Sequence, residues 1–260
     1  MGYERDNERL NAAIRFAVDH HAGQLRKGTT HSYIIHPMEV MSILMRMDAD
    51  TDLLIAGVLH DTVEDTDATI NEIVALFGED VGALVAHHSE DKSKTWDERK
   101  RHAIEELKTA DKRLKMLVMA DKLSNLRSIA ADYRKLGEQL WERFHAPAEK
   151  QSWYYSEVQD ALLSLHSCPD TQDMYWEMVA LYKDVFVRYY VNEQGNRLYQ
   201  YARHGEVHML TKGDPIWRPI SRINDGEELI ALSRMQAEAT EDDWNAQMVM
   251  QRQMNGYLNS

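Results

Sequence analysis

The chain has 260 residues, and its 30 Lys and Arg against 43 Asp and Glu give a formal net charge of −13. With 43% hydrophobic and 28% charged residues it has the composition of a globular protein of one or two domains, which argues against wholesale disorder. The pI near 5.4 argues against a protein that coats nucleic acid, and no apolar run approaches the roughly 20 residues needed to cross a membrane.

The first part of the chain, residues 1–166, is predicted to be all helical, because apolar residues recur at helical spacing along it. Thr69 is the expected N-cap of one helix, with Glu72 completing a capping box and Gly78 ending the helix. Helices are expected at 11–23, from 36 onward, and at 52–64, 70–77, 97–110, 111–131, 134–145 and 147–166.

The remaining residues, 167–260, are predicted to form a small α+β appendage, so the fold class is mainly α with a boundary near 167. Cys168, the one cysteine, lies at this boundary and fits a reducing cytoplasm, which is the location we expect. Two aromatic, β-rich runs flank the turn NEQGN at 192–196, as in a hairpin. In order, we expect a helix at 173–183, strands at 185–191, 197–203, 206–211 and 216–220, and helices at 224–238 and 241–256.

The segment LHDTVEDT at 59–66 concentrates charge directly after an apolar run. On a continuous helix, His60, Asp61, Glu64 and Asp65 would span about 140° of the circumference. Carboxylates this close repel one another, and burying their ionised forms is costly. A metal cation, or a cation bound to phosphate, would offset that repulsion.

Two distant residues supply the missing ligand types for such a cation. His36 begins a predicted helix, and Asp121 follows the apolar turn MLVMA, where a buried carboxylate is rare unless it is paired or bound to metal. With His60 and Asp61 they form a set of two imidazoles and two carboxylates. This set suits Mn, Fe, Co or Zn better than Mg, which favours oxygen ligands.

A water at an open position of this metal would become acidic, and Glu64 and Asp65 are placed to take its proton. Simpler explanations exist for each residue alone: His36 as a helix cap, and Asp121 as an ion-pair partner of Lys122. The joint occurrence of the three segments in one helical domain favours the metal site.

The residues from about 11 to 166 resemble the HD-domain hydrolases of the RelA/SpoT type, especially the free-standing small alarmone hydrolases. The similar segments, in order, are AGQLRKG at 22–28, YIIHP at 33–37, AGVLHDTVEDT at 56–66, FG at 77–78, ADKLSNLR at 120–127, RF at 143–144 and KQSWYY at 150–155. Each segment alone is weak evidence, whereas their shared order and spacing are specific.

The resemblance implies an enzyme that hydrolyses (p)ppGpp at its 3′-diphosphate to GDP or GTP and pyrophosphate. It implies one Mn²⁺ ion, with other divalent transition metals as substitutes, and attack by a metal-bound hydroxide. The implied metal ligands are His36, His60, Asp61 and Asp121, and the implied catalytic residues that activate or position the water are Glu64 and Asp65. The implied substrate contacts are Arg26, Lys27, Asn125, Lys150 and Tyr154.

The implied substrate contacts agree with their chemistry. A guanidinium such as that of Arg26 can stack on a purine, and cations such as Lys27 suit a substrate with several negative charges. Asn125 lies four residues after Asp121, on the same helix face, and can therefore point into the same pocket.

Two other functions remain open at this point. The first is an HD phosphohydrolase that acts on another nucleotide: ppApp, NADPH or a nucleoside monophosphate. The second is a non-catalytic binding module on an HD scaffold. Residues 167–260 resemble no domain that we recognise, and no synthetase domain is evident, so we expect a protein that degrades alarmone. The exposed edges of the predicted hairpin could pair with a second copy or with a protein partner.

Overall fold

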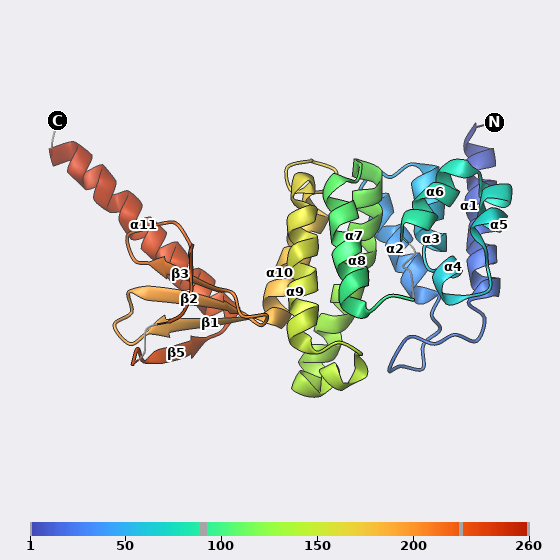
Figure 1. Cartoon of the computed structure of the whole chain (residues 1–260). Coiled ribbons are helices and arrows are strands. Elements are labelled where there is room, and N and C mark those ends of the chain that lie inside the picture. The colour runs from blue at the N-terminus through green and yellow to red at the C-terminus, as the bar shows by residue number, and fades with distance from the viewer. Residues whose placement is uncertain (1, 89–92, 224–225, 259–260) are drawn as a thin grey trace. The chain divides into compact units, whose positions relative to one another are not determined.

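The computed structural model describes residues 2–88, 93–223 and 226–258 (Figure 1). These residues form two compact units, one of Met1–Ala146 with Tyr154–Leu181 and one of Pro147–Trp153 with Tyr182–Ser260. The predicted fold class, mainly α with a helical part followed by a small α+β part, is confirmed. Residues 167–181 group with the helical unit, and the functional division into 1–166 and 167–260 stays a prediction.

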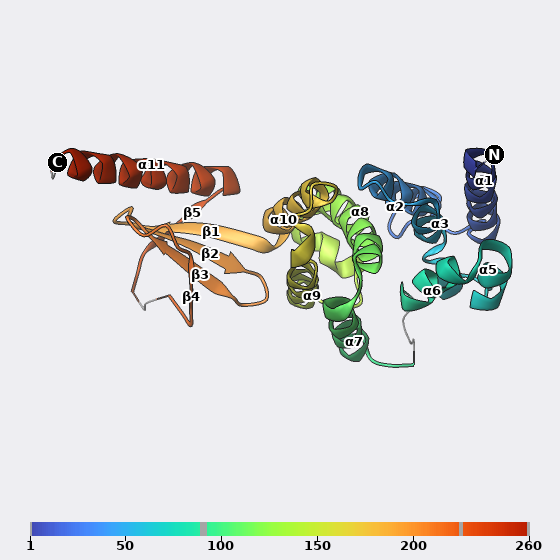
Figure 2. The same cartoon turned by 90° about the horizontal axis from the view of Figure 1, so that it is seen from above.

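Helices make up most of the first unit (Figure 2). They are α1 (Gly2–His20), α2 (Ile35–Arg46), α3 (Thr51–Leu59), α4 (Thr62–Asp65), α5 (Ile70–Phe77), α6 (Glu79–His88), α7 (Trp96–Thr109), α8 (Lys112–Leu136), the 3-10 helix η1 (Gly137–Arg143), α9 (Ala148–Ala161), the 3-10 helix η2 (Leu163–Leu165) and α10 (Gln172–Phe186). Helices α9 and α10 contribute residues to both units.

Helix α3 is the centre of the first unit, and it contacts α1, α2, α6 and α8. Its residues Leu53, Ile55 and Leu59 are at most 1% exposed. Gly57 allows the close approach of α2, since a Cβ atom there would lie 2.4 Å from Leu44 Cδ1. The apolar run that precedes His60 is therefore core, as its composition predicts.

The capping box predicted for α5 is confirmed. The Thr69 side chain accepts from the Glu72 backbone N–H, the Glu72 carboxylate accepts from the Thr69 backbone N–H, and the helix ends at Gly78, whose φ is +101°. Thr95 and Glu98 form the same motif at the start of α7. Both motifs satisfy backbone donors that have no partner within the helix.

The helix predicted at 52–64 is wrong in one respect, because it is broken at 60–61. α3 ends at Leu59 and α4 begins at Thr62. The His60 ring nitrogen Nδ1 lies 2.8 Å from the Gly57 carbonyl oxygen, and the Thr62 hydroxyl donates to the Leu59 carbonyl oxygen at 2.6 Å. Side chains thus bond the last carbonyls of α3, and this local bonding competes with continuation of the helix.

Other boundaries also differ from the predictions. The segment predicted at 134–145 is the 3-10 helix η1, and the helix predicted at 147–166 ends at Ala161 and is followed by η2. Helix α6 was not predicted. No helix in the described ranges is both long enough and apolar enough to span a membrane.

The second unit contains an antiparallel sheet with the strand order β4-β3-β2-β1-β5. The strands are β1 (Val187–Asn192), β2 (Arg197–Ala202), β3 (Val207–Thr211), β4 (Arg218–Ile220) and β5 (Leu229–Leu232). The predicted hairpin is confirmed as β1 and β2, with Val187 opposite Ala202 and Val191 opposite Leu198.

The helix predicted at 224–238 is wrong over residues 229–232, whereas the segment predicted at 241–256 is helical but belongs to a longer helix; residues 224 and 225 lie outside the described residues. Leu229–Leu232 forms β5 on the free edge of β1, and a continuous helix, α11 (Arg234–Leu258), follows. Nothing breaks that helix near 240, where the Thr240 hydroxyl donates to the Gln236 carbonyl oxygen. Trp244 of α11 packs with Leu198 and Leu210 of the sheet.

Candidate metal centre and adjoining cavity

Three segments of the first unit bring buried histidines and aspartates together. His36 lies in the first turn of α2, His60 and Asp61 lie at the break between α3 and α4, and Asp121 lies in α8. His36, His60 and Asp121 are at most 3% exposed, and each offers a ligand atom within 4.8 Å of the others. The residues that were predicted from separate motifs therefore meet at one place.

The four side chains face a common centre. His36 Nε2 lies 3.2 Å from Asp121 Oδ1 and 3.5 Å from Asp61 Oδ2. His60 Nε2 lies 2.9 Å from Asp61 Oδ2 and 3.8 Å from Asp121 Oδ1. Two imidazole nitrogens and two carboxylates thus converge in a buried position.

The donor chemistry of this centre fits a divalent transition metal. The Nδ1 atoms of both histidines are engaged elsewhere, His60 with the Gly57 carbonyl oxygen and His36 with Ser124 Oγ at 2.9 Å. This leaves Nε2 of each ring directed at the two carboxylates. Mixed imidazole and carboxylate ligands suit Mn, Fe, Co or Zn, so the residues present can hold such an ion.

The centre is electrostatically arranged to hold positive charge. Burial alone would lower the pKa of His60, but the Asp61 and Asp121 carboxylates outweigh burial and raise it to about 9. Burial alone would raise the pKa of Asp61, but the charge of His60 and the hydrogen bonds from both histidines hold it well below its usual value. Either a proton or a metal cation bound here would offset the negative charge of the Asp61 and Asp121 carboxylates.

Further polar groups surround the two carboxylates. The Tyr33 hydroxyl donates to Asp61 Oδ2 at 2.5 Å, and burial together with this carboxylate raises the tyrosine pKa. Asp121 accepts from Lys122 Nζ and from Asn125 Nδ2, both at 2.6 Å. The simpler ion pair between Asp121 and Lys122 is therefore present beside the histidine cluster.

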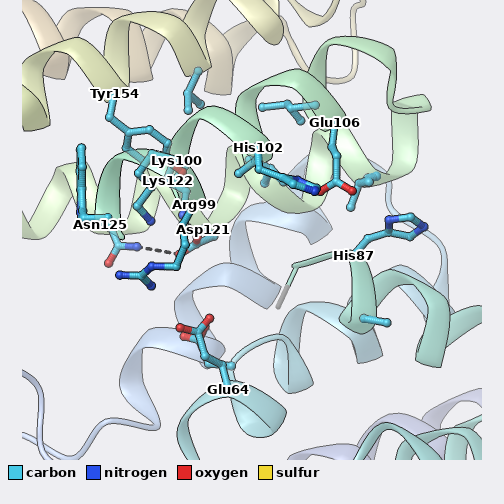
Figure 3. Close-up of a pocket in the computed structure, with 18 of the residues that line it drawn as sticks. Glu64, His87, Arg99, Lys100, His102, Glu106, Asp121, Lys122, Asn125 and Tyr154 are labelled. Carbon is cyan, nitrogen blue, oxygen red and sulfur yellow. Dashed lines mark hydrogen bonds and ion pairs between the residues drawn. The ribbon is translucent and has the colours of Figure 1, made fainter. Parts of the chain in front are cut away.

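A cavity of ≈ 520 Å³ adjoins the centre. Tyr33, His36, Asp61 and Glu64 form part of its wall, and helices α7 and α8 form another part. Glu64 points from α4 toward Asp121 and Arg99 (Figure 3). The cations that line the cavity are Lys94, Arg99, Lys100 and Lys122. A carboxylate-rich wall thus faces a cation-rich wall.

An aromatic pair lies among these cations. The Trp96 and Tyr154 rings, both on the cavity wall, meet edge to face with centroids 6.1 Å apart. Lys100 Nζ lies 4.8 Å and Lys122 Nζ 5.8 Å from the centroid of the Tyr154 ring. The wall therefore offers flat rings beside positive charge, which suits an aromatic, phosphorylated ligand.

Only some of the predicted catalytic and substrate-binding residues line the cavity. Glu64, Asn125 and Tyr154 line the cavity. Asp65 does not appear among the described lining residues, since its side chain is exposed and accepts from Gln24 Nε2 at 3.5 Å.

The predicted basic residues Arg26, Lys27 and Lys150 are also absent from the described lining of the cavity. The Arg26 guanidinium lies 5.8 Å from the centroid of the Tyr33 ring, and Lys27 Nζ lies 5.9 Å from that of Phe144. Lys150 belongs to the segment Pro147–Trp153, which groups with the second unit.

The cavity-lining residues of α7 were missed in the sequence. Trp96, Lys100, Ala103 and Leu107 share one face of this helix because they lie three or four residues apart. That spacing shows a shared face. Which neighbour the face meets depends on how α7 packs, and no local sequence pattern specifies it.

Comparisons with known proteins agree with this geometry. The HD domain model matches residues 13–146. The chain is 40% identical over 119 residues to a Drosophila melanogaster protein named guanosine-3′,5′-bis(diphosphate) 3′-pyrophosphohydrolase MESH1, a match that covers 45% of this chain and 66% of that protein. The Homo sapiens protein of the same name is 40% identical over 123 residues, covering 46% of this chain and 69% of that protein.

A solved structure is also similar. It is described as a metazoan orthologue of SpoT that hydrolyses ppGpp, and it matches with a TM-score of 0.55 at 29% identity. That match covers 67% of this chain and 94% of the other. The chain spans about two thirds of the length of the curated relatives, and the HD domain model ends at residue 146, before the strands of the second unit.

Proposed function

This chain belongs to the HD-domain family, and on that basis we propose that it is a metal-dependent hydrolase of (p)ppGpp. The reaction removes the 3′-diphosphate and leaves GDP or GTP and pyrophosphate, as the names of the relatives state for those proteins. The observation that carries the proposal is the buried histidine and aspartate centre beside a cavity with a cationic wall.

His36, His60, Asp61 and Asp121 would hold one divalent ion, which we take to be Mn²⁺. Support comes from the convergence of their nitrogen and oxygen atoms and from the bonds that turn Nε2 of each histidine toward the centre. When bound, such an ion lowers the pKa of a coordinated water and polarises a phosphoryl oxygen.

Glu64 is the proton acceptor for the attacking water in this proposal. Its carboxylate lines the cavity on the same wall as Asp61, whereas Asp65 is exposed. Asp65, the next residue in the chain, would help to position that water.

The cationic wall would bind the second phosphate arm of the substrate. A substrate with a diphosphate at each of two positions cannot place both at the metal, and Arg99, Lys100 and Lys122 line the facing part of the cavity. Asn125, bonded to Asp121, and Tyr154, between the two lysines, would hold the nucleotide between the arms.

Arg26 would contact the purine from the rim of the site, because its guanidinium lies over the Tyr33 ring that lines the cavity. Lys27 would contribute charge next to it. A contact between Lys150 and the substrate is proposed from the sequence resemblance alone. We also propose a cytoplasmic location, which the free Cys168 supports. Residues 167–260 are proposed to bind a second copy or a protein partner.

Incubation of metal-stripped protein with ppGpp, with and without Mn²⁺, tests the function. Ion-exchange chromatography should show GDP and pyrophosphate only with the metal. Asp61→Ala should abolish turnover, whereas the matched control Asp173→Ala, at the exposed start of α10, should not. Turnover of ppApp, NADPH or a nucleoside monophosphate in place of ppGpp would contradict the proposal that ppGpp is the substrate. The absence of turnover with all four compounds would favour a non-catalytic binding module.

A further inference from the structure

A chain of hydrogen bonds runs outward from His36. Its Nδ1 atom lies 2.9 Å from Ser124 Oγ, and the Ser124 hydroxyl donates to Glu39 Oε2 at 2.9 Å. The other oxygen of Glu39 accepts from Arg127 at 3.1 Å, and Arg127 donates twice to Glu177 of α10, at 2.7 and 2.8 Å. The chain lies within the first unit and joins α2, α8 and α10.

The donors and acceptors fix the direction of every bond. Because Ser124 gives its single hydroxyl hydrogen to the carboxylate of Glu39, its oxygen must accept from His36 Nδ1. Nδ1 of His36 therefore carries a hydrogen, which leaves Nε2, the atom that faces Asp61 and Asp121, as the ring nitrogen that can bind a metal. His36 and Ser124 are at most 2% exposed, so water does not compete for these bonds.

We infer that Ser124 and Glu39 are positioning residues for the metal: they hold the His36 ring in the orientation and tautomer that bind it, and so strengthen metal binding. A carboxylate linked to a ligating histidine has this effect on metal affinity. Arg127 and Glu177 hold the Glu39 carboxylate in place. The inference rests on the proposed role of His36 as a metal ligand.

His60 provides an internal comparison. Its Nδ1 bonds to the backbone carbonyl of Gly57, a partner that no side-chain substitution removes. The orientation of His36, in contrast, depends on side chains from two helices. Metal affinity should therefore respond to substitutions at Ser124 and Glu39 that touch neither the metal nor the cavity, since neither residue is among the described lining residues.

The test is a titration of metal-stripped protein with Mn²⁺, in which the electron paramagnetic resonance signal reports the free ion. Ser124→Ala should weaken binding about 10- to 100-fold, the range found when such outer partners are removed. Glu39→Gln, which keeps the hydrogen-bond acceptor and loses the charge, should weaken it less. The matched controls are Ser128→Ala, one turn further along α8, and Glu138→Gln in η1.

The double variant tests whether the two residues act in series. Once Ser124 is absent, Glu39 has no path to His36, so adding Glu39→Gln to Ser124→Ala should cause no further loss of Mn²⁺ affinity. Losses that add, or unchanged affinity in both single variants with unchanged circular dichroism, would overturn the inference. Glu39→Gln preserves shape and keeps the test valid if Ser124→Ala does not fold.

A second measurement does not depend on the metal. Nitrogen-15 NMR spectra of the histidine rings in metal-free protein report which nitrogen carries the hydrogen. We expect a hydrogen on Nδ1 of His36 that is protected from exchange in the wild type and loses this protection in Ser124→Ala. Wild-type protein that binds no Mn²⁺ would contradict the proposed function, and a His36 ring with no hydrogen on Nδ1 would by itself overturn the inference.

Discussion

At the scale of single residues, Glu64 and Asp65 show how much one position along a chain changes a carboxylate's role. Glu64 lines the cavity, whereas Asp65 is exposed and bonded to Gln24. Both were predicted from the same motif, because a continuous helix would have placed them on one side. Both lie in α4, where adjacent residues are about 100° apart, and the break at 60–61 sets which of them faces the cavity.

Glu64→Gln should therefore lower kcat for ppGpp hydrolysis by about 100-fold or more, the usual contribution of a general base. Asp65→Asn should lower it much less. Steady-state kinetics at saturating Mn²⁺ measures both. Equal losses in the two variants, or a larger loss in Asp65→Asn, would contradict the assignment of the proton acceptor.

Lys100→Ala should raise KM for ppGpp with little change in kcat. Lys100 lines the cavity and is not one of the proposed metal ligands, and a hydrogen bond to a charged group contributes about 1.5–3 kcal/mol, which corresponds to roughly a tenfold or larger effect. The control is Lys108→Ala, on an exposed part of the same helix. A KM that stays the same in Lys100→Ala would show that the phosphates bind elsewhere.

At the scale of elements, the sequence predicts best where the signal is local. The start and end of α5 follow from Thr69, Glu72 and Gly78 because caps involve only neighbouring residues. β5 was taken for part of a helix, since Leu229–Leu232 becomes a strand only by pairing with β1, which is distant in the sequence. The convergence of His36, His60 and Asp121 could be anticipated because such residues are rare in apolar contexts, whereas the cavity-lining residues of α7 could not, because many surface helices carry such residues.

Removal of one cap should have a measurable cost. Thr69→Ala takes away the acceptor for the Glu72 backbone N–H and should lower the free energy of unfolding by about 1 kcal/mol. Urea denaturation followed by circular dichroism measures the change. Thr109→Ala, at the end of α7, should have a smaller effect, and equal effects would contradict the assigned role of the cap.

A surface ion-pair cluster connects three helices and predicts a pH dependence. Arg113 of α8 donates to Asp80 of α6 and to Asp50, the N-cap of α3, and the hydrogen bond from Arg113 holds the pKa of Asp80 below its usual value. The stabilisation from a lowered carboxyl pKa is present above the unfolded-state pKa, about 4, and is lost as the pH falls through the folded-state value.

The wild type should accordingly be slightly more stable than Asp80→Asn at pH 7, and the difference should disappear as the pH falls below about 4. Because Asp80 is largely exposed, the effect is small. Thermal melting of both proteins across this range measures it. A difference that grows toward low pH would have the wrong sign for this ion pair.

At the scale of the whole molecule, the candidate metal centre joins helices that are far apart in the sequence. α2, the α3–α4 break and α8 each contribute to it. A ligand that binds only the folded state stabilises that state by RT ln(1 + [L]/Kd), or about 2.7 kcal/mol at 100 times Kd.

Mn²⁺ should therefore raise the melting temperature of metal-stripped wild-type protein, and EDTA should reverse the rise. Asp61→Asn should abolish the shift, whereas Asp173→Asn should preserve it. Differential scanning calorimetry measures these changes. A shift that persists in Asp61→Asn would show that the ion stabilises the protein from another place.

The position of Asp121 in α8 also affects how the protein is made on the ribosome. A nascent chain that has emerged only as far as α7 already contains His36, His60 and Asp61 but lacks the second carboxylate, Asp121. If these residues hold the metal as proposed, binding by the complete set requires that α8 has left the exit tunnel. Products of early termination would consequently lack the full candidate centre.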